Sequence, residues 1–144
     1  NISDGAPEAM TNLADLVTVS LRADTITLWL ATECKPYVRM TQAGKWTGRA
    51  KDYNNFQVAW KERIRLAMGV RGVSPLPGSV PLFFSVNFQY ARKTYHAFDL
   101  DNLVKSSLDL CQGVVFRGVD SWVDRIVSDR IPGVTGISIT CGVL

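Results

Sequence analysis

The run from Leu82 to Tyr90 (LFFSVNFQY) constrains the fold more than any other stretch of the chain. Apolar and polar side chains alternate along it with a period of two, broken only by Phe83. Side chains two apart on a strand point to the same face, so the run predicts a strand with one buried face. The chain therefore contains a β-sheet, and the other elements are placed around this strand.

Four further segments have the composition of strands. Residues 17–21 and 25–30 alternate apolar and polar residues and are rich in β-branched side chains. They predict two strands, or one bent strand. Residues 122–130 and 135–142 predict two more, joined through the turn Ile131-Pro132-Gly133.

A helix is predicted over residues 100–111. Its apolar residues recur at helical spacing and describe one buried face: Leu100, Leu103, Val104, Ser107, Leu108 and Cys111. Asp101 stands where an N-cap is expected, and Gly113 where the helix would stop.

A second helix is predicted from about Tyr53 to Met68. Asp52 is the expected N-cap and Gly69 the expected residue after the C-terminus. Phe56 and Trp60 belong to its apolar stripe and are expected in the core, rather than stacked on a nucleic-acid base.

The order of strands, helix, strand, helix and two strands predicts an α+β fold. We expect one domain over residues 16–144, with two main helices packed on a mixed β-sheet. Residues 1–15 are polar and without a clear period, and they are expected to form a flexible N-terminal extension. A chain of 144 residues that is 47% hydrophobic can bury a core of its own.

The cysteines and the hydropathy indicate a compartment. Cys34, Cys111 and Cys141 are odd in number and widely spaced, which is not typical of a disulfide scaffold. No stretch approaches the length of a membrane span, and no basic-then-apolar leader opens the sequence. These features predict a reduced, cytoplasmic protein with no membrane partner.

Charge is distributed unevenly along the chain. Residues 35–93 carry a formal charge of +9, while residues 1–34 carry −4 and residues 94–144 carry −2. A basic middle beside acidic segments favours a polyanion on one surface and a cation on another. The alternative is an ordinary solvated basic surface.

Asp99 and Asp101 lie where the chain passes from a strand into a helix. In extended chain, residues two apart share a face, and Lys105 follows Asp101 by one helical turn. Asp120 follows in the next loop. If the three carboxylates converge, each pair repels by about 3–4 kcal/mol at an effective dielectric of about 20, so a cation or raised pKa values are required.

An all-oxygen cluster suits Mg²⁺ or Mn²⁺. The alternatives remain open: Asp101 as a helix cap, Asp99 as a solvated strand end, Asp120 as a turn residue and Lys105 as a solvated lysine.

The motif around these residues resembles a known family. Residues 96–105 read HAFDLDNLVK, a Leu-Asp pair and Gly-Val-Val follow, and Asp120-Ser121 comes nineteen residues after Asp101. This pattern is similar to the signature of RusA-like Holliday junction resolvases. The basic, proline-containing segment KPYVRMT at residues 35–41 is similar to the segment after that family's first strand.

The resemblance implies a RusA-like fold and a homodimeric endonuclease that resolves four-way DNA junctions by paired symmetric nicks, leaving 5′-phosphate ends. It implies Mg²⁺, with Mn²⁺ as a substitute and no nucleotide cofactor, held by Asp99, Asp101 and Asp120. Lys105 would act on the scissile phosphate. The basic residues expected to bind DNA are Lys35, Arg39, Lys45, Arg49, Lys51, Arg92 and Lys93.

Two positions depart from the family pattern. Val119 stands where a second Asp is usual, and Trp122 where Gln is usual. These departures favour the alternative of a catalytically weak or inactive DNA-binding relative. A phosphohydrolase acting on nucleotides is a third reading, but no Gly-rich phosphate loop supports it. His96 and Asp109 are not expected to be catalytic.

Overall fold

The computed structural model describes residues 13–39, 48–91 and 96–144. A helical turn at residues 13–16 precedes the first strand. The elements that follow are β1 (Val17–Arg22), β2 (Thr25–Leu30), α2 (Gly48–Val70), β3 (Leu82–Tyr90), α3 (Leu100–Cys111), the 3-10 helix η3 (Asp120–Trp122), β4 (Val123–Pro132) and β5 (Gly136–Val143).

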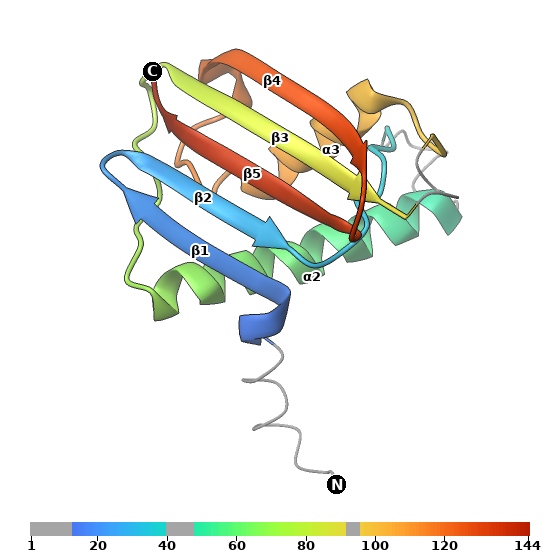
Figure 1. Ribbon diagram of the computed structural model, residues 1–144. Coiled ribbons are helices and arrows are strands. Elements are labelled where there is room, and N and C mark those ends of the chain that lie inside the picture. Colours follow the sequence, from blue (N-terminus) through green and yellow to red (C-terminus); the bar gives the residue numbers. More distant parts are fainter. Residues whose placement is uncertain (1–12, 40–47, 92–95) are drawn as a thin grey trace, which may run out of the picture.

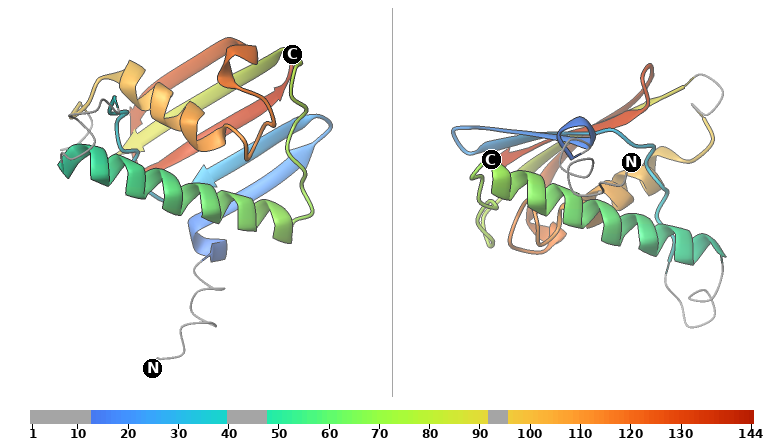
Figure 2. Two further views of the ribbon diagram at one scale, coloured as in Figure 1. Left: turned by 180° about the vertical axis from the view of Figure 1, so that it is seen from behind. Right: turned by 90° about the horizontal axis from the view of Figure 1, so that it is seen from below.

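The five strands form one mixed sheet in the order β1-β2-β5-β3-β4. The β3–β4 pair is parallel, and the other neighbours are antiparallel. Helices α2 and α3 lie on one face of the sheet, and no element of the described residues covers the other face (Figures 1 and 2). The predicted α+β class, with two main helices on a mixed sheet, is confirmed.

The strand β3 occupies the predicted residues and shows the predicted alternation. Its side chains alternate between buried and half-buried along the whole strand. Phe84, Val86 and Phe88 are fully buried beneath the helices. The run at residues 82–90 therefore supplies the middle of the core, as its periodicity indicated.

The N-terminal strands form a hairpin rather than one bent strand. Val17 pairs with Leu30 and Arg22 with Thr25, so the chain reverses at residues 23–24. Ala23 adopts a positive φ of 53° in this turn. Strands β4 and β5 occur close to the predicted ranges.

Helix α2 is longer at both ends than predicted. It begins at Gly48, so Asp52 lies inside the first turns and is not the cap. It runs past Gly69 to Val70, and Gly72, two residues further on, has a φ of 67°. Gly72 N–H donates to the Gly69 carbonyl at 3.1 Å and Val73 N–H to the Met68 carbonyl at 2.8 Å, the pattern of a Schellman motif. Trp60 is buried in the core, as expected.

Helix α3 spans the predicted residues, but its N-cap is Asp99 rather than Asp101. Asp101 lies in the first turn, two residues further on. Gly113 has a φ of 82° just after the C-cap residue Gln112, which confirms it as the stop.

The remaining sequence-level expectations concern the N-terminus and the cysteines. Residues 1–12 of the predicted extension lie outside the described residues, whereas Leu13 and Leu16 in the helical turn pack against the core. The second expectation concerns the cysteines, and Cys34, Cys111 and Cys141 are all free and buried. Burial raises the pKa of the Cys34 and Cys141 thiols to about 12. In the described ranges, no helix is both long and apolar enough to cross a membrane.

Candidate functional site

The two acidic residues of the DLDN motif lie at the N-terminus of α3. Asp99 is the N-cap residue, with extended backbone and no side-chain capping hydrogen bond, and both carboxylates are exposed. Oδ1 of Asp101 accepts from the backbone N–H of Asn102 at 2.9 Å. The helix dipole favours negative charge at this end, by about 0.3–1 kcal/mol for an exposed group. The N-terminus of α3 can therefore accommodate the carboxylates of both Asp99 and Asp101.

Asp120 and Lys105 form an ion pair that joins η3 to α3. Lys105 Nζ lies 3.3 Å from Asp120 Oδ2, and the Lys105 side chain is 45% exposed. The backbone N–H of Asp120 donates to Gln112 Oε1 at 2.9 Å, which fixes the start of η3 on the end of α3. Asp120 thus lies on the side of α3 from which Lys105 projects, one helical turn beyond Asp101.

The environment of Lys105 favours its charged form. Partial burial acts against the ammonium group, but the hydrogen bond and charge of Asp120 outweigh it, and together with Asp109 and Tyr37 they raise the pKa of Lys105. Lys105 is therefore a cation at neutral pH and balances one of the carboxylates.

Two tyrosines beside this pair were not picked out by the sequence. Lys105 Nζ lies 5.7 Å from the centroid of the Tyr37 ring, within the range of a cation–π contact. Tyr37 meets Tyr53 edge to face at 5.6 Å, and the Tyr53 hydroxyl donates to Asp109 Oδ2 at 2.5 Å. The only sequence signal for this pair was the position of Tyr37 within the basic segment KPYVR.

The segment after β2 is held against the first turn of α3. The backbone N–H of Tyr37 donates to the Asn102 carbonyl at 3.0 Å. Because of this contact, the basic residues that flank Tyr37 lie close to the acidic end of α3.

Two of the predicted DNA-binding residues share a small cavity at this place. Lys35 and Arg49 line a space of about 140 Å³ together with Tyr53 of α2 and Phe98, the residue before Asp99. The structure therefore brings basic side chains from two separate segments to the start of α3. Arg39 and Lys51 are exposed nearby in sequence, while Lys45, Arg92 and Lys93 lie outside the described residues.

Other cations of the basic middle have structural partners. Lys61 Nζ donates to the carbonyls of Asp109 and Gln112, the latter at 2.9 Å, at the C-terminal end of α3. Arg63 lies 4.6 Å from the centroid of the Trp60 ring, and Arg65 pairs with Glu62. Part of the +9 charge is thus already engaged by partners within the fold.

The donor set partly fits the Mg²⁺ site predicted from the sequence. All three predicted ligands are carboxylates, which Mg²⁺ prefers. However, within residues 13–39, 48–91 and 96–144, no three His, Cys, Asp or Glu side chains are grouped so that they could hold a metal ion. Asp120 is compensated by Lys105 in this arrangement, and the Mg²⁺ site stays a prediction.

Comparisons with known proteins add no assignment. No protein-family model matches the sequence, and no curated protein matches it.

Proposed function

We propose that the protein is a Mg²⁺-dependent endonuclease that cleaves branched DNA, with a four-way junction as its substrate. One observation carries the proposal: the Lys105–Asp120 ion pair lies on the α3 side-chain stripe that begins with Asp101. The similarity of DLDNLVK to the RusA-like signature supports the same reading. A cytoplasmic location would follow from a DNA substrate.

Each residue has a defined task in this proposal. Asp99, Asp101 and Asp120 would hold Mg²⁺, which would supply an activated water and neutralise charge on the scissile phosphate. Lys105 would leave its ion pair with Asp120 and bind the scissile phosphate instead. There it would stabilise the negative charge that develops on the phosphate. Its high pKa suits it to this task and excludes it as a base at neutral pH.

Lys35 and Arg49 would bind the sugar–phosphate backbone next to the reacting phosphate. Contacts of this kind position a nucleic acid but read little of its sequence. Selectivity would therefore come from the shape of the branch. Two strands of a symmetric junction are nicked together only when two copies of the chain act on it.

The test uses a labelled four-way junction and a linear duplex of matched sequence, each with Mg²⁺ and with EDTA. We expect paired nicks in the junction only when Mg²⁺ is present, with ends that a ligase can seal. Cleavage that persists in EDTA, or that is equally fast on the linear duplex, would contradict the proposal.

Single substitutions separate chemistry from binding. We expect Asp101→Asn and Asp120→Asn to lower the cleavage rate by at least about a hundredfold, since each removes a charge proposed to act in the transition state. Junction affinity should be kept or increased because a negative charge is lost. Asp124→Asn, on the exposed start of β4, is the matched control and should cleave normally.

A DNA-binding protein without nuclease activity is the second candidate. Two observations favour it. The negative charge of Asp120 is already balanced by Lys105, and the exposed Val119 stands where the family pattern has a second acid. Tight junction binding without cleavage in either Mg²⁺ or Mn²⁺ would select this candidate.

A further inference from the structure

The two edges of the sheet differ in how they are protected against pairing with another chain. Edge strand β4 carries four charged residues and a terminal proline in ten positions. Charges and proline on an edge discourage such pairing. Edge strand β1 has no charged residue from Val17 to Leu21, and no described segment pairs with its free side. Within the described part of the chain, β1 is therefore the edge that is open to an added strand.

The free side of β1 presents defined backbone groups. Ala31 N–H donates to the Leu16 carbonyl at 2.8 Å, so these two residues form a hydrogen-bonded pair of the β1–β2 hairpin. Hydrogen-bonded pairs alternate along two antiparallel strands. The N–H and C=O groups of Val19 and Leu21 therefore point away from β2, toward the place that an added strand would take.

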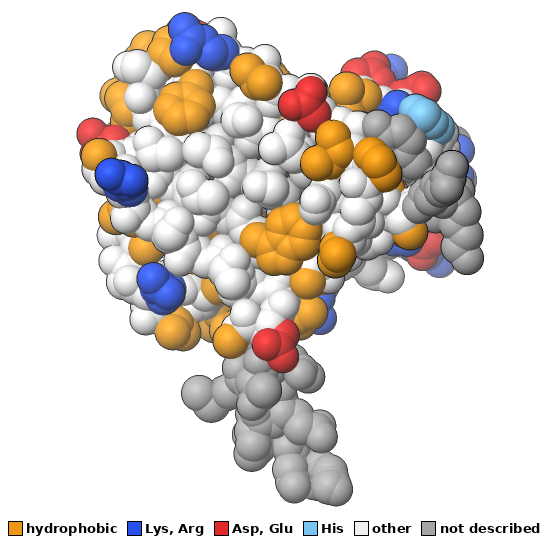
Figure 3. Space-filling view, in the orientation of Figure 1, with side chains coloured by type: hydrophobic (Ala, Val, Ile, Leu, Met, Phe, Trp, Pro, Cys, Tyr) orange, Lys and Arg blue, Asp and Glu red, His pale blue; other side chains and the backbone are white. Residues whose placement is uncertain are grey.

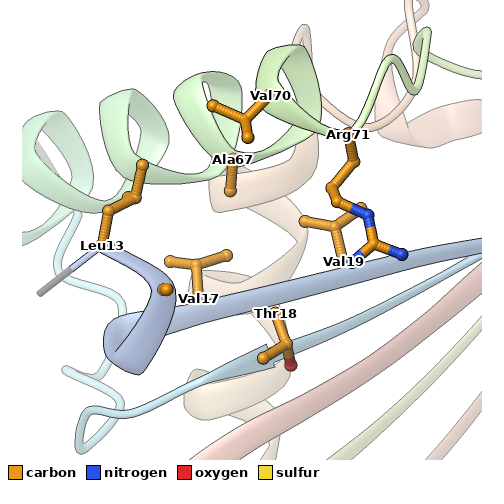
Figure 4. Close-up of a pocket in the computed structure, with 8 residues that line it drawn as sticks. Leu13, Val17, Thr18, Val19, Ala67, Val70 and Arg71 are labelled. Atoms are coloured by element: carbon orange, nitrogen blue, oxygen red, sulfur yellow. The ribbon is translucent and has the colours of Figure 1, made fainter. Parts of the chain in front are cut away.

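An apolar groove lies on the helix side of this edge, between β1 and the C-terminal end of α2 (Figure 4). Its volume is about 230 Å³. Leu13, Val17 and Val19 line it on one side, and Ala67 and Val70 line it on the other. A strand added to β1 would place its inward side chains in this groove, so those side chains have to be apolar.

A second hollow, lined by hydroxyl groups, lies at the other face of the same edge. Its volume is about 240 Å³, and one of its walls is Trp29, whose ring lies against Gly136. Figure 3 looks onto this face of the sheet, which is mostly neutral polar surface with few charges. Because side chains of a strand alternate between the two faces, every second side chain of an added strand would lie at this hollow. The hydroxyls that line it come from three neighbouring strands: Thr18, Ser20, Thr27 and Ser138.

Arg71 borders both spaces. It follows α2 directly and lines the apolar groove as well as the hydroxyl-lined hollow, and Figure 4 shows its side chain extending toward Val19. Among the described residues that line the two spaces, Arg71 alone is charged. It is exposed, and no ion pair within the described ranges engages it. The β1 edge therefore offers an uncompensated positive charge to the molecule that covers it.

We propose that the β1 edge binds an extended, acidic segment of another protein, which adds to the sheet as a further strand. Apolar residues of the segment would lie opposite Val19 and Leu21 and enter the groove, and the residues between them would lie over the hydroxyls. Aspartate or glutamate at these intervening positions would pair with Arg71 and accept hydrogen bonds from the neighbouring hydroxyls. The backbone ladder supplies affinity, and the two spaces select the alternating pattern.

Other occupants fit the edge less well. A second copy of this chain would add its own β1, which has no acidic residue, and pairing about Val19 would bring the Arg71 side chains of both copies together. A nucleic acid would pair with Arg71 but would leave the apolar groove unfilled. An acidic segment with alternating apolar residues satisfies the backbone groups, the groove and the charge at once.

The β1 edge is remote from the candidate nuclease site. Arg49 lies at the start of α2 and Arg71 just beyond its end, and a helix of 23 residues is about 35 Å long. The segment and a DNA branch can therefore be bound at the same time. Binding of the segment does not depend on the proposed nuclease activity, and it would tie that activity to a second protein.

Amide hydrogen exchange of the full chain, followed by NMR, tests the strand addition. The probe is a short blocked peptide in which valine and aspartate alternate. We expect the amides of Val19 and Leu21 to exchange at least about tenfold more slowly when the peptide is bound, because they gain hydrogen bonds. The amides of Thr18 and Ser20 already bond to β2 and serve as the internal control, with little change expected.

The charge preference is tested by substitutions on both sides of the contact. Replacing the aspartates of the peptide by asparagine should weaken its binding at least about threefold, the size of an exposed ion pair. Arg71→Gln should remove this preference, so that the two peptides bind alike. Arg125→Gln is the matched control and should keep the preference, because Arg125 is equally exposed but lies on β4, at the opposite edge of the sheet.

Several results would overturn the proposal. One is unchanged exchange at Val19 and Leu21 up to the solubility limit of the peptide, and another is an undiminished preference for aspartate in Arg71→Gln. Slower exchange that develops with protein concentration alone would assign the edge to a second copy of the chain. Slower exchange of the same amides on addition of four-way junction DNA alone would assign the edge to nucleic acid.

Discussion

Tyr53 links the two helices through a single side-chain hydrogen bond. Its hydroxyl donates to Asp109 across the α2–α3 contact, and Gln57, one turn later, donates to the Ser106 carbonyl at 3.0 Å. Burial and the bond to Asp109 raise the pKa of Tyr53 above its usual value of 10.0. Tyr53 therefore stays protonated at neutral pH and keeps its bond to Asp109.

We expect Tyr53→Phe to lower the free energy of unfolding by about 1–2 kcal/mol at neutral pH, because the carboxylate loses a donor. A folded-state pKa above the unfolded value gives stability that is complete below about pH 10 and is lost as pH rises further. Urea unfolding at pH 8 and above pH 10 should thus show a larger effect of the substitution at pH 8.

Tyr37→Phe is the control, because it removes a tyrosine hydroxyl without removing the bond to Asp109. An effect of Tyr53→Phe that is independent of pH would contradict the assignment.

At this scale the sequence identified charged residues more readily than their neighbours. Lys105 and Asp120 stand out in a local motif, and the structure joins them. The contacts of Tyr37 and Asp109 could not be predicted, because they involve residues far apart in the chain. Whether Asp99, Asp101 and Asp120 act together depends on a cation, which no sequence pattern measures.

The helices show where local signals suffice and where they compete. The apolar period predicts α3 to the residue, but Asp99 and Asp101 are equally good caps by type, and the assignment to Asp101 is wrong. Two glycines stand three apart at the C-terminal end of α2, and only the backbone shows that Gly72, just beyond the helix, is the one with a positive φ. Element centres were predictable because packing fixes them, whereas ends depend on small differences in capping.

Alanine substitutions at these two glycines should change the stability of the fold in opposite directions. Gly69 lies inside α2, and nothing lies within 4 Å of the place that a Cβ would take there, so Gly69→Ala should stabilise the fold by about 0.5–1 kcal/mol. Gly72 has a φ of 67°, so Gly72→Ala should destabilise it by about 1 kcal/mol. Thermal and urea unfolding of both variants measure this difference, and equal effects would contradict the assigned helix end.

At the scale of the whole molecule, the described part of the basic middle contains two groups with different surroundings. Lys35, Arg39, Arg49 and Lys51 lie beside the start of α2 or the segment before it, whereas Lys61, Arg63 and Arg65 have partners within the fold. Net charge along the sequence therefore overstates the surface that a polyanion would meet.

This division predicts a selective effect on salt dependence. Arg39→Ala should weaken junction binding and reduce the slope of log affinity against log salt by about one, since one phosphate contact and its counterion release are lost. Arg65→Ala, which breaks only the pair with Glu62, should leave the slope unchanged. The slope is measured from the junction affinity of each variant between about 50 and 200 mM salt. An unchanged slope for Arg39→Ala would mean that the DNA does not contact Arg39.

The class of the fold followed from the sequence, but the strand order did not. Periodicity reports whether a strand has one buried face, and β3 was predictable for that reason, whereas residues 17–30 could have formed two strands or one bent strand. It does not report which strands are neighbours. The insertion of β5 between β2 and β3 is a long-range choice that depends on the packing of the complete sheet.

This central position of β5 sets an order of events during synthesis on the ribosome. Until residues 136–143 emerge, the hairpin β1–β2 and the unit β3-α3-β4 have no shared ladder, and each exposes an unpaired edge. The two halves can close into one sheet only after β5 has been synthesised. During that interval the unpaired edges of β2 and β3 are exposed, and edges of this kind are prone to aggregation.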